Sequence, residues 1–321
     1  MHHDRIPVIP EAVLKTHKVN EPSDTRFKAA ARLLQTLWRQ DAGLPIGSHR
    51  SPDGKRRKLG SRINTTSAQA GANFLNADIA NLARREVVYR EPGAVIDQER
   101  LWTNLLSSQP LCFNFFGALK LDQDKANRFF RTMFPGYVER VEGIIFEHSP
   151  GRGDPAFTAD HSAFDVFVPI ITTTGESGFV AIEVKYSETM MEPLAQLKPR
   201  YNELSASAQV FNDPTAQALR EAPLQQLWRE HLLSRAMVEN GLYGQGRFVV
   251  IHPEQNTNCA AAVRAYRRHL ASSDPAESGF DVRTLDECVT MLATIGDEAT
   301  ASALRARYLD FARIDRAIFG E

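Results

Sequence analysis

Apolar and polar positions alternate with a period of two in the second half of the chain, as they do in half-buried strands. The alternation covers three segments, 137–149 (YVERVEGIIFEHS), 162–174 (SAFDVFVPIITTT) and 178–188 (GFVAIEVKYSE). The connection GESG between the last two is short and contains glycine, so these two segments predict a hairpin. A fourth apolar segment, 246–253 (GRFVVIHP), predicts a strand that returns to the same sheet.

Helical periodicity dominates the first half of the chain. Segment 23–43 begins at a Ser/Asp cap and places Phe27, Ala31, Leu34 and Trp38 on one stripe. The organisation is therefore a helical N-terminal region, 1–135, packed on a sheet-containing core with C-terminal helices, 136–321. The segment 107–121 is strongly apolar and expected to be buried, and further helices are predicted at 77–90, 97–107, 122–133, 215–239 (divided at Pro223), 257–271 and 302–320.

Segment 48–63 (SHRSPDGKRRKLGSRI) is basic and rich in turn-forming residues, so it predicts a loop rather than a packed element. It contains Pro52-Asp53-Gly54-Lys55, but no strand presents these residues, and a metal site needs ligands on rigid elements. Two interpretations of the basic loop 50–62 stay open: a solvated cationic loop, or a contact to the phosphate backbone of a nucleic acid. The residues expected to make that contact are Arg56, Arg57 and Lys58.

The composition is that of an ordinary globular protein, because 43% of the 321 residues are hydrophobic and 24% are charged. A formal net charge of −1 gives the molecule no overall attraction for polyanions, so a nucleic-acid site would depend on a local cluster of cations. Cys112, Cys259 and Cys288 are far apart in sequence, which fits a reducing compartment and argues against a disulfide framework. No N-terminal apolar stretch and no run of about 18 apolar residues occurs. We therefore expect a cytoplasmic protein without a membrane partner.

Charged residues interrupt the apolar alternation at one place. Glu183 and Lys185 replace apolar residues on one face of segment 178–188, and Asp165 does the same at the start of segment 162–174. Antiparallel pairing brings these two ends together, so the three side chains are expected in one neighbourhood. A cross-strand ion pair on a solvated face would explain Glu183 and Lys185 alone, whereas the added aspartate favours a metal site.

Two carboxylates that share a divalent cation avoid the several kcal/mol that a lone buried carboxylate costs. Hard oxygen ligands with open water positions suit Mg²⁺, for which Mn²⁺ can substitute. A lysine beside the ion can hold or deprotonate the attacking water and offset charge on a phosphate. Asp165, Glu183 and Lys185 therefore predict a magnesium site that acts on phosphate esters.

The arrangement Asp165 … Glu183-Val184-Lys185, on a hairpin flanked by helices, resembles the core of the PD-(D/E)XK nuclease superfamily, although Phe164 stands where that motif has proline. The resemblance implies an α/β (α+β) fold with a restriction-endonuclease-like core, a central mixed β-sheet flanked by helices and a helical N-terminal half. Five segments spread over most of the chain also resemble a bacterial family of restriction-endonuclease-like nucleases, namely 43–63, 101–119, 146–167, 179–188 and 225–233.

The same resemblance implies roles for individual residues. Asp165 and Glu183 would be metal ligands, the main-chain carbonyl of Val184 a further ligand, and Lys185 the catalytic lysine. Members of the superfamily cut phosphodiester bonds with metal-activated water. Some place a glutamine on the helix after the lysine strand, for which Gln226 is preferred here and Gln225 competes.

Four further residues have both a functional and an ordinary interpretation. Glu147 ends the strand before that of Asp165, so it could reach the metal directly or through water, or lie in solvent. Arg229 is three residues after Gln226 and so lies on the same helix face. Arg152 and His161, in the predicted loop before Asp165, could hold a phosphate or be polar surface residues.

The sequence thus favours a Mg²⁺-dependent nuclease that acts on DNA. One alternative is a module with a nuclease-like fold that binds nucleic acid without cutting it. Another is a nuclease component that needs a partner protein of a defence or repair system, or that works as a homodimer.

Overall fold

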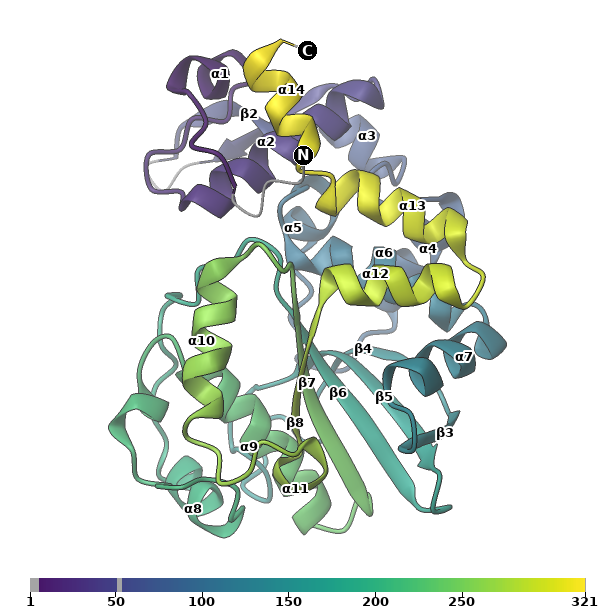
Figure 1. Cartoon of the computed structure of the whole chain (residues 1–321), viewed down its shortest axis with the longest axis vertical. Coiled ribbons are helices and arrows are strands. Elements are labelled where there is room, and N and C mark those ends of the chain that lie inside the picture. Colours follow the sequence, from purple (N-terminus) through teal and green to yellow (C-terminus); the bar gives the residue numbers. More distant parts are fainter. Residues whose placement is uncertain (1–5, 51–53, 321) are drawn as a thin grey trace.

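The computed structural model describes residues 6–50 and 54–320 and contains a central mixed sheet flanked by helices (Figure 1). The fold class expected from the sequence is confirmed. The sheet has the strand order β3-β5-β6-β7-β8, and β4 also pairs with β5. Pairing is antiparallel from β3 to β6 and parallel from β6 to β8. The strands are β3 Val138–Val141, β4 Ile145–His148, β5 Phe164–Thr172, β6 Ser177–Val184, β7 Gln245–His252 and β8 Phe280–Thr284.

The hairpin of β5 and β6 and the returning strand β7 are confirmed, but two strand predictions are wrong. Segment 137–149 forms β3 and β4 rather than one strand. The break lies opposite Pro169, which has no N–H to donate to a continuous neighbour, and its carbonyl accepts from Glu142 N–H at 2.8 Å. Strand β8 was not predicted; it is only five residues long, although Phe280 and Val282 alternate with Asp281 and Arg283 along it.

The helices surround the sheet, and most of the predicted ones are present. The predicted helix 97–107 is shorter, because the main chain turns extended at Asn104 and a new helix begins at Ser108. No helix in the two described ranges is long and apolar enough to cross a membrane. The helices are α1 Glu11–Thr16, α2 Arg26–Asp41, α3 Thr65–Gln69, α4 Ala77–Val88, α5 Gln98–Thr103, α6 Ser108–Lys120, α7 Gln123–Met133, α8 Pro199–Ser207, the 3₁₀ turn η1 Gln217–Arg220, α9 Gln225–Glu239, α10 Thr257–Arg267, α11 Pro275–Ser278, α12 Leu285–Thr294, α13 Glu298–Leu304, the π-helical turn η2 Arg305–Leu309 and α14 Ala312–Phe319.

Most of the basic segment forms the two strands of a β-hairpin, so the prediction of a loop is wrong for Arg50 and for residues 56–62. Strands β1 Ile46–Arg50 and β2 Arg56–Ile63 pair antiparallel, and the second half of β2 is buried against α2. Gly60 permits this packing, because a Cβ there would lie 2.3 Å from the carbonyl oxygen of His17. Because the exposed half of β2 carries basic side chains, the sequence pattern did not identify it as a strand. Of the sequence Pro52-Asp53-Gly54-Lys55, the first two residues lie outside the described ranges.

Side chains alternate between two covered faces of the sheet. Val166, Val168 and Ile182 pack in a cluster with α2, α4, α6, α7 and the C-terminal helices. Phe167 and Phe179 pack in a second cluster with α8, α9 and α10 (Figure 1). By the same alternation Glu183 belongs to the second face, where Gln226 of α9 reaches it.

A buried polar network joins the two ends of the chain to the end of β6. The Arg307 guanidinium is fully buried and donates to the main-chain oxygen of Asn73 at 2.8 Å and to Gln35 Oε1 at 3.3 Å, and it lies 4.1 Å from the centre of the Trp38 ring. Gln35 also donates to the hydroxyl of Tyr186 at 3.1 Å. Tyr186 follows Lys185 directly, so this network helps to fix the end of β6. The C-terminal helix α14 also packs on α2, while the division of the chain at residue 135 stays a prediction.

Arg307→Ala is expected to lower the free energy of unfolding by about 3 kcal/mol, because it leaves buried acceptors without a donor and opens a cavity. Urea denaturation monitored by circular dichroism measures this change. The exposed neighbour provides a matched control, Arg305→Ala, which should change stability by less than about 0.5 kcal/mol. Equal losses in the two variants would contradict a structural role of the Arg307 network.

Candidate active site

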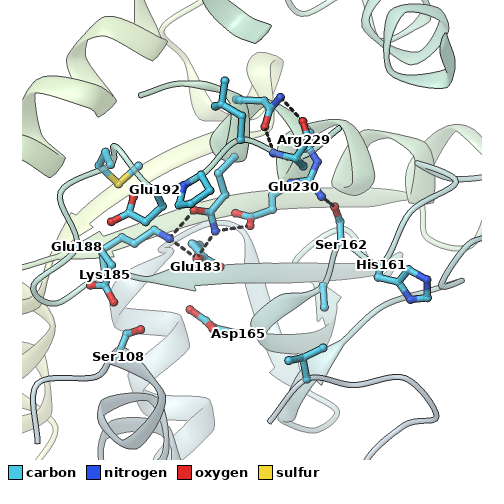
Figure 2. A pocket seen from close by; sticks show the side chains of 18 of the residues that line it. Ser108, His161, Ser162, Asp165, Glu183, Lys185, Glu188, Glu192, Arg229 and Glu230 are labelled. Carbon is cyan, nitrogen blue, oxygen red and sulfur yellow. Dashed lines mark hydrogen bonds and ion pairs between the residues drawn. The ribbon is translucent and has the colours of Figure 1, made fainter. Parts of the chain in front are cut away.

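A cavity of about 450 Å³ opens where β6 ends and β5 begins. Its walls come from these strands, from the first turns of α6 and α9, and from the segments that precede β5 and follow β6. Figure 2 shows Asp165, Glu183 and Lys185 projecting into this one space. The three residues that the sequence singled out are therefore brought together.

The register of the hairpin sets Asp165 opposite Glu183. Val166 pairs with Ile182, and Asp165 and Glu183 are the next residues on the two strands. Phe164 packs in the second cluster, so the alternation of β5 breaks there, and Asp165 also borders Cys112 and Phe113 of the first cluster. Asp165 Oδ2 accepts a hydrogen bond from the main-chain N–H of Val184 at 2.8 Å, which holds its carboxylate at the mouth of the hairpin. The Val184 side chain packs in the cluster on the other face. Its carbonyl as a metal ligand stays a prediction.

Lys185 is held by a closed triangle of interactions. Its Nζ lies 2.6 Å from Glu183 Oε1 and 2.9 Å from Gln226 Oε1. Gln226 Nε2 in turn donates to the same Glu183 oxygen at 2.9 Å. Lys185 and Glu183 are each only 5% exposed, so the triangle fixes both charges in a buried position. Gln226 occupies the place beside the lysine, whereas Gln225 binds the main chain of Ala195.

Glu230 belongs to the same site, and the sequence interpretation missed it. It lies one helical turn after Gln226, and its Oε1 accepts from Gln226 Nε2 at 2.8 Å. Its Oε2 is buried and has no hydrogen-bond partner. The spacing of four residues on α9 was the available signal, since residues at that distance share a helix face.

The site carries more negative than positive charge. Burial, Glu183 and Glu147 raise the pKa of Asp165, and burial with Glu183 raises the pKa of Glu230. Burial alone would lower the pKa of Lys185, but the surrounding carboxylates together raise it, so its ammonium is charged. These directions have one consequence: the pocket stabilises added positive charge.

Glu147 occupies the third strand of the site. The pairing of Phe146 with Val166 and of His148 with Phe164 places it beside Asp165. Its main chain is left-handed, with φ of 53°, and Gln109 Nε2 donates to its carboxylate at 3.5 Å. Burial and the charge of Glu183 raise the pKa of Glu147 to about 7. The carboxylate therefore lies in the cavity wall, and its binding of metal stays a prediction.

The donor set of this cavity fits a hard divalent cation. Across residues 6–50 and 54–320, no group of three His, Cys, Asp or Glu side chains is close enough to hold a metal ion by itself. Mg²⁺ does not need such a group, because it is usually bound by one or two carboxylates and completes its octahedron with water and phosphate oxygens. Asp165 and Glu183 supply two carboxylates to the same cavity, and the excess negative charge favours a cation.

Arg229 binds the segment that precedes β5. It is not part of the triangle around Lys185. Its guanidinium donates to Asp160 Oδ2, with Nε at 3.1 Å, and to the Ser162 hydroxyl at 2.6 Å. Tyr201 also donates to Asp160 at 2.8 Å. Burial would raise the pKa of Asp160, but hydrogen bonds from Thr158 and Arg229 hold it below its usual range. Asp160 is thus a buried charge that anchors this segment to α9.

The predicted phosphate-binding residues lie in different places. Arg152 and His161 line the cavity, but Arg152 binds the main-chain oxygens of Glu147 and His161, and the His161 side chain is exposed. Arg56, Arg57 and Lys58 are exposed on β2 and do not line this cavity.

The comparisons with known proteins agree with this geometry. The model of the PD-(D/E)XK nuclease superfamily matches residues 22–310. Members of this superfamily typically use divalent metals. Neither the curated proteins nor the solved structures give a significant match to this chain.

Glu230→Gln is expected to stabilise the metal-free protein at pH 8 by about 1 kcal/mol, because it removes a buried carboxylate with an unpartnered oxygen. Because the folded-state pKa of Glu230 is raised, its contribution to stability falls as the pH rises above its ordinary value of 4.5. The gain should therefore be larger at pH 8 than at pH 4.

Thermal denaturation in EDTA at both pH values measures the gain. The matched control on the same helix is Glu239→Gln, since Glu239 is exposed, and it should show no such pH-dependent gain. A Glu230→Gln variant that is less stable than wild type at pH 8 would contradict this account of the charge balance.

Proposed function

The chain belongs to the PD-(D/E)XK nuclease superfamily, and from this membership and the geometry of the cavity we propose that it hydrolyses phosphodiester bonds of DNA. The cofactor is Mg²⁺, which Mn²⁺ can replace. The observation that carries the proposal is the convergence of Asp165, Glu183 and Lys185 from two paired strands into one cavity.

Asp165 and Glu183 would hold the ion. A bound Mg²⁺ supplies a water of lowered pKa and polarises the phosphoryl oxygens. Both carboxylates border the same cavity, and the N–H of Val184 holds that of Asp165 in place. Glu147 lines the same cavity, and its carboxylate would be available as a further ligand of the ion.

Lys185 would act as a positioned cation. Since its ammonium is charged, it donates hydrogen bonds and offsets negative charge on the phosphate as the P–O bond breaks. Gln226 contacts both Lys185 and Glu183, so it sets the distance between the cation and the metal-binding carboxylate. The cavity contains no cysteine in its lining, and this proposal uses water as the nucleophile.

A cytoplasmic location is part of the proposal. The three cysteines are buried and form no disulfide, as expected in a reducing compartment. DNA is proposed as the substrate because the superfamily membership points to a nuclease and basic side chains gather on the hairpin of β1 and β2.

Asp165→Asn, Glu183→Gln and Lys185→Met are each expected to reduce cleavage of DNA by about 10³-fold or more, because each removes a charge that acts on the reacting phosphate. Plasmid and labelled oligonucleotides in Mg²⁺ or Mn²⁺ provide the measurement. Isothermal titration of Mg²⁺ should show binding to wild type and weaker binding to Glu183→Gln.

The control for this series is Glu298→Gln, an exposed carboxylate at the start of α13, which should cut like wild type. Circular dichroism checks that each variant is folded. Wild-type protein that binds Mg²⁺ yet cuts neither DNA nor RNA, single- or double-stranded, would overturn the proposed hydrolysis.

A further inference from the structure

A second cavity, of about 380 Å³, lies beside the first. Its walls come from α2, the hairpin of β1 and β2, α5 and the segment after β6. Arg100, Glu188 and Glu192 line both cavities, so the two spaces adjoin. The N-terminal region therefore contributes a wall to a space that continues from the metal-binding carboxylates.

Basic side chains dominate this second cavity. Lys28, His49, Arg57, Arg62 and Arg100 line it together with Arg32 and three glutamates, Glu21, Glu188 and Glu192. These glutamates do not neutralise the whole set, because the lining has five lysine and arginine side chains against three carboxylates.

Two of the cations, Lys28 and Arg100, have no hydrogen-bond or ion-pair partner among the residues that the structure describes. Arg32, Arg57 and Arg62 are paired with Asp24, Glu21 and Glu99. Lys28 is half-buried on α2 and Arg100 is exposed on α5, and both line the cavity, where a ligand can reach them.

Buried polar atoms in the wall also lack partners. Arg62 is 7% exposed, and its Nε has no hydrogen-bond partner, although Nη1 binds Glu99 at 2.8 Å and Thr103 at 3.1 Å. His49 Nδ1 is likewise buried and unpartnered. Each such group costs about 1–3 kcal/mol unless a ligand or water satisfies it. Arg62 therefore offers a buried, charged N–H donor to an oxygen of a ligand, such as a phosphate oxygen.

We propose that this second cavity binds a phosphate group of the substrate strand, away from the bond that is cut, with Arg100 and Lys28 as its principal contacts. The inference rests on the proposed function, because it requires a DNA strand that passes from one cavity to the other. Guanidinium and ammonium groups recognise phosphate oxygens by charge-assisted hydrogen bonds. Phosphates repeat along a DNA strand. A DNA strand held in the second cavity therefore presents a neighbouring phosphate to Lys185 and the two carboxylates.

The phosphate could come from the interior of a strand or from its end. The experiment measures binding of fluorescein-labelled oligonucleotides, single-stranded and duplex, with a 5′-hydroxyl or a 5′-phosphate, by anisotropy in EDTA. No cleavage is needed, so the result does not depend on hydrolysis. The variants are Arg100→Gln, Lys28→Gln and the double variant, which change exposed or half-buried side chains outside the core.

Each single variant should weaken binding by about 5- to 10-fold at 0.1 M salt and reduce the slope of log K against log salt by about 0.7–0.9, because each removes one phosphate contact. The matched control is Arg128→Gln, an exposed arginine on α7 outside both cavities, which should bind like wild type. A loss seen with all oligonucleotides indicates an interior phosphate, and a loss confined to 5′-phosphorylated ones indicates a strand end.

Two outcomes overturn the proposal. One is a loss in Arg100→Gln and Lys28→Gln no greater than in Arg128→Gln, even if the wild type cuts DNA. The other is a wild type that binds none of the oligonucleotides at low salt. Conversely, a wild type that binds with this pattern but cuts nothing would sustain the phosphate site while the proposed hydrolysis fails.

Discussion

The pairing register of β5 with β6 is the constraint on which the site depends. A strand has a side-chain period of two, so a shift of one residue would reverse the faces of one strand and move the Asp165 carboxylate away from the Val184 N–H that it binds. The register is fixed by the short turn at Gly175 and by apolar side chains packed on both faces of the hairpin. The apolar packing of the hairpin, which takes no part in the chemistry, therefore determines where the two carboxylates lie.

The helix α9 adds further side chains to the site at the end of the hairpin. Its first turns bring Gln226 and Glu230 over the sheet, and the bonds of Arg229 to Asp160 tie the segment before β5 to the same helix. Burying so many carboxylates beside one lysine raises the free energy of the metal-free protein, and a divalent cation would lower it. The site is therefore arranged at some expense to stability, as functional sites often are.

Much of this could be predicted from the sequence, because the informative signals are local. Alternation of apolar residues predicts β5 and β6, and charges that break the alternation indicate Asp165, Glu183 and Lys185. The position of Gln226 depends on helical spacing alone. Each of these features is carried by a few consecutive residues, so no knowledge of tertiary contacts is needed.

Other parts depend on contacts between distant segments, which local pattern does not encode. Strands β1 and β2 were not recognised in the sequence, because basic residues interrupt their apolar pattern. Their burial comes from packing on α2 and from the approach of Gly60 to His17. The break between β3 and β4 follows from Pro169 on the neighbouring strand. Glu230 becomes part of the site only because α9 crosses the hairpin, although its spacing from Gln226 was visible in advance.

The near-zero net charge conceals a separation of charge between the two adjoining cavities. One is rich in carboxylates and favours a cation, whereas the other is rich in arginine and lysine and favours an anion. A metal ion alone would satisfy only the first, and a polyanion alone would be repelled by it. A phosphodiester strand that arrives with its divalent cation complements both, because the ion screens the strand from the carboxylates while the phosphates meet the cations. This complementarity is how a protein with a net charge of −1 would bind the nucleic acid that we propose as its substrate.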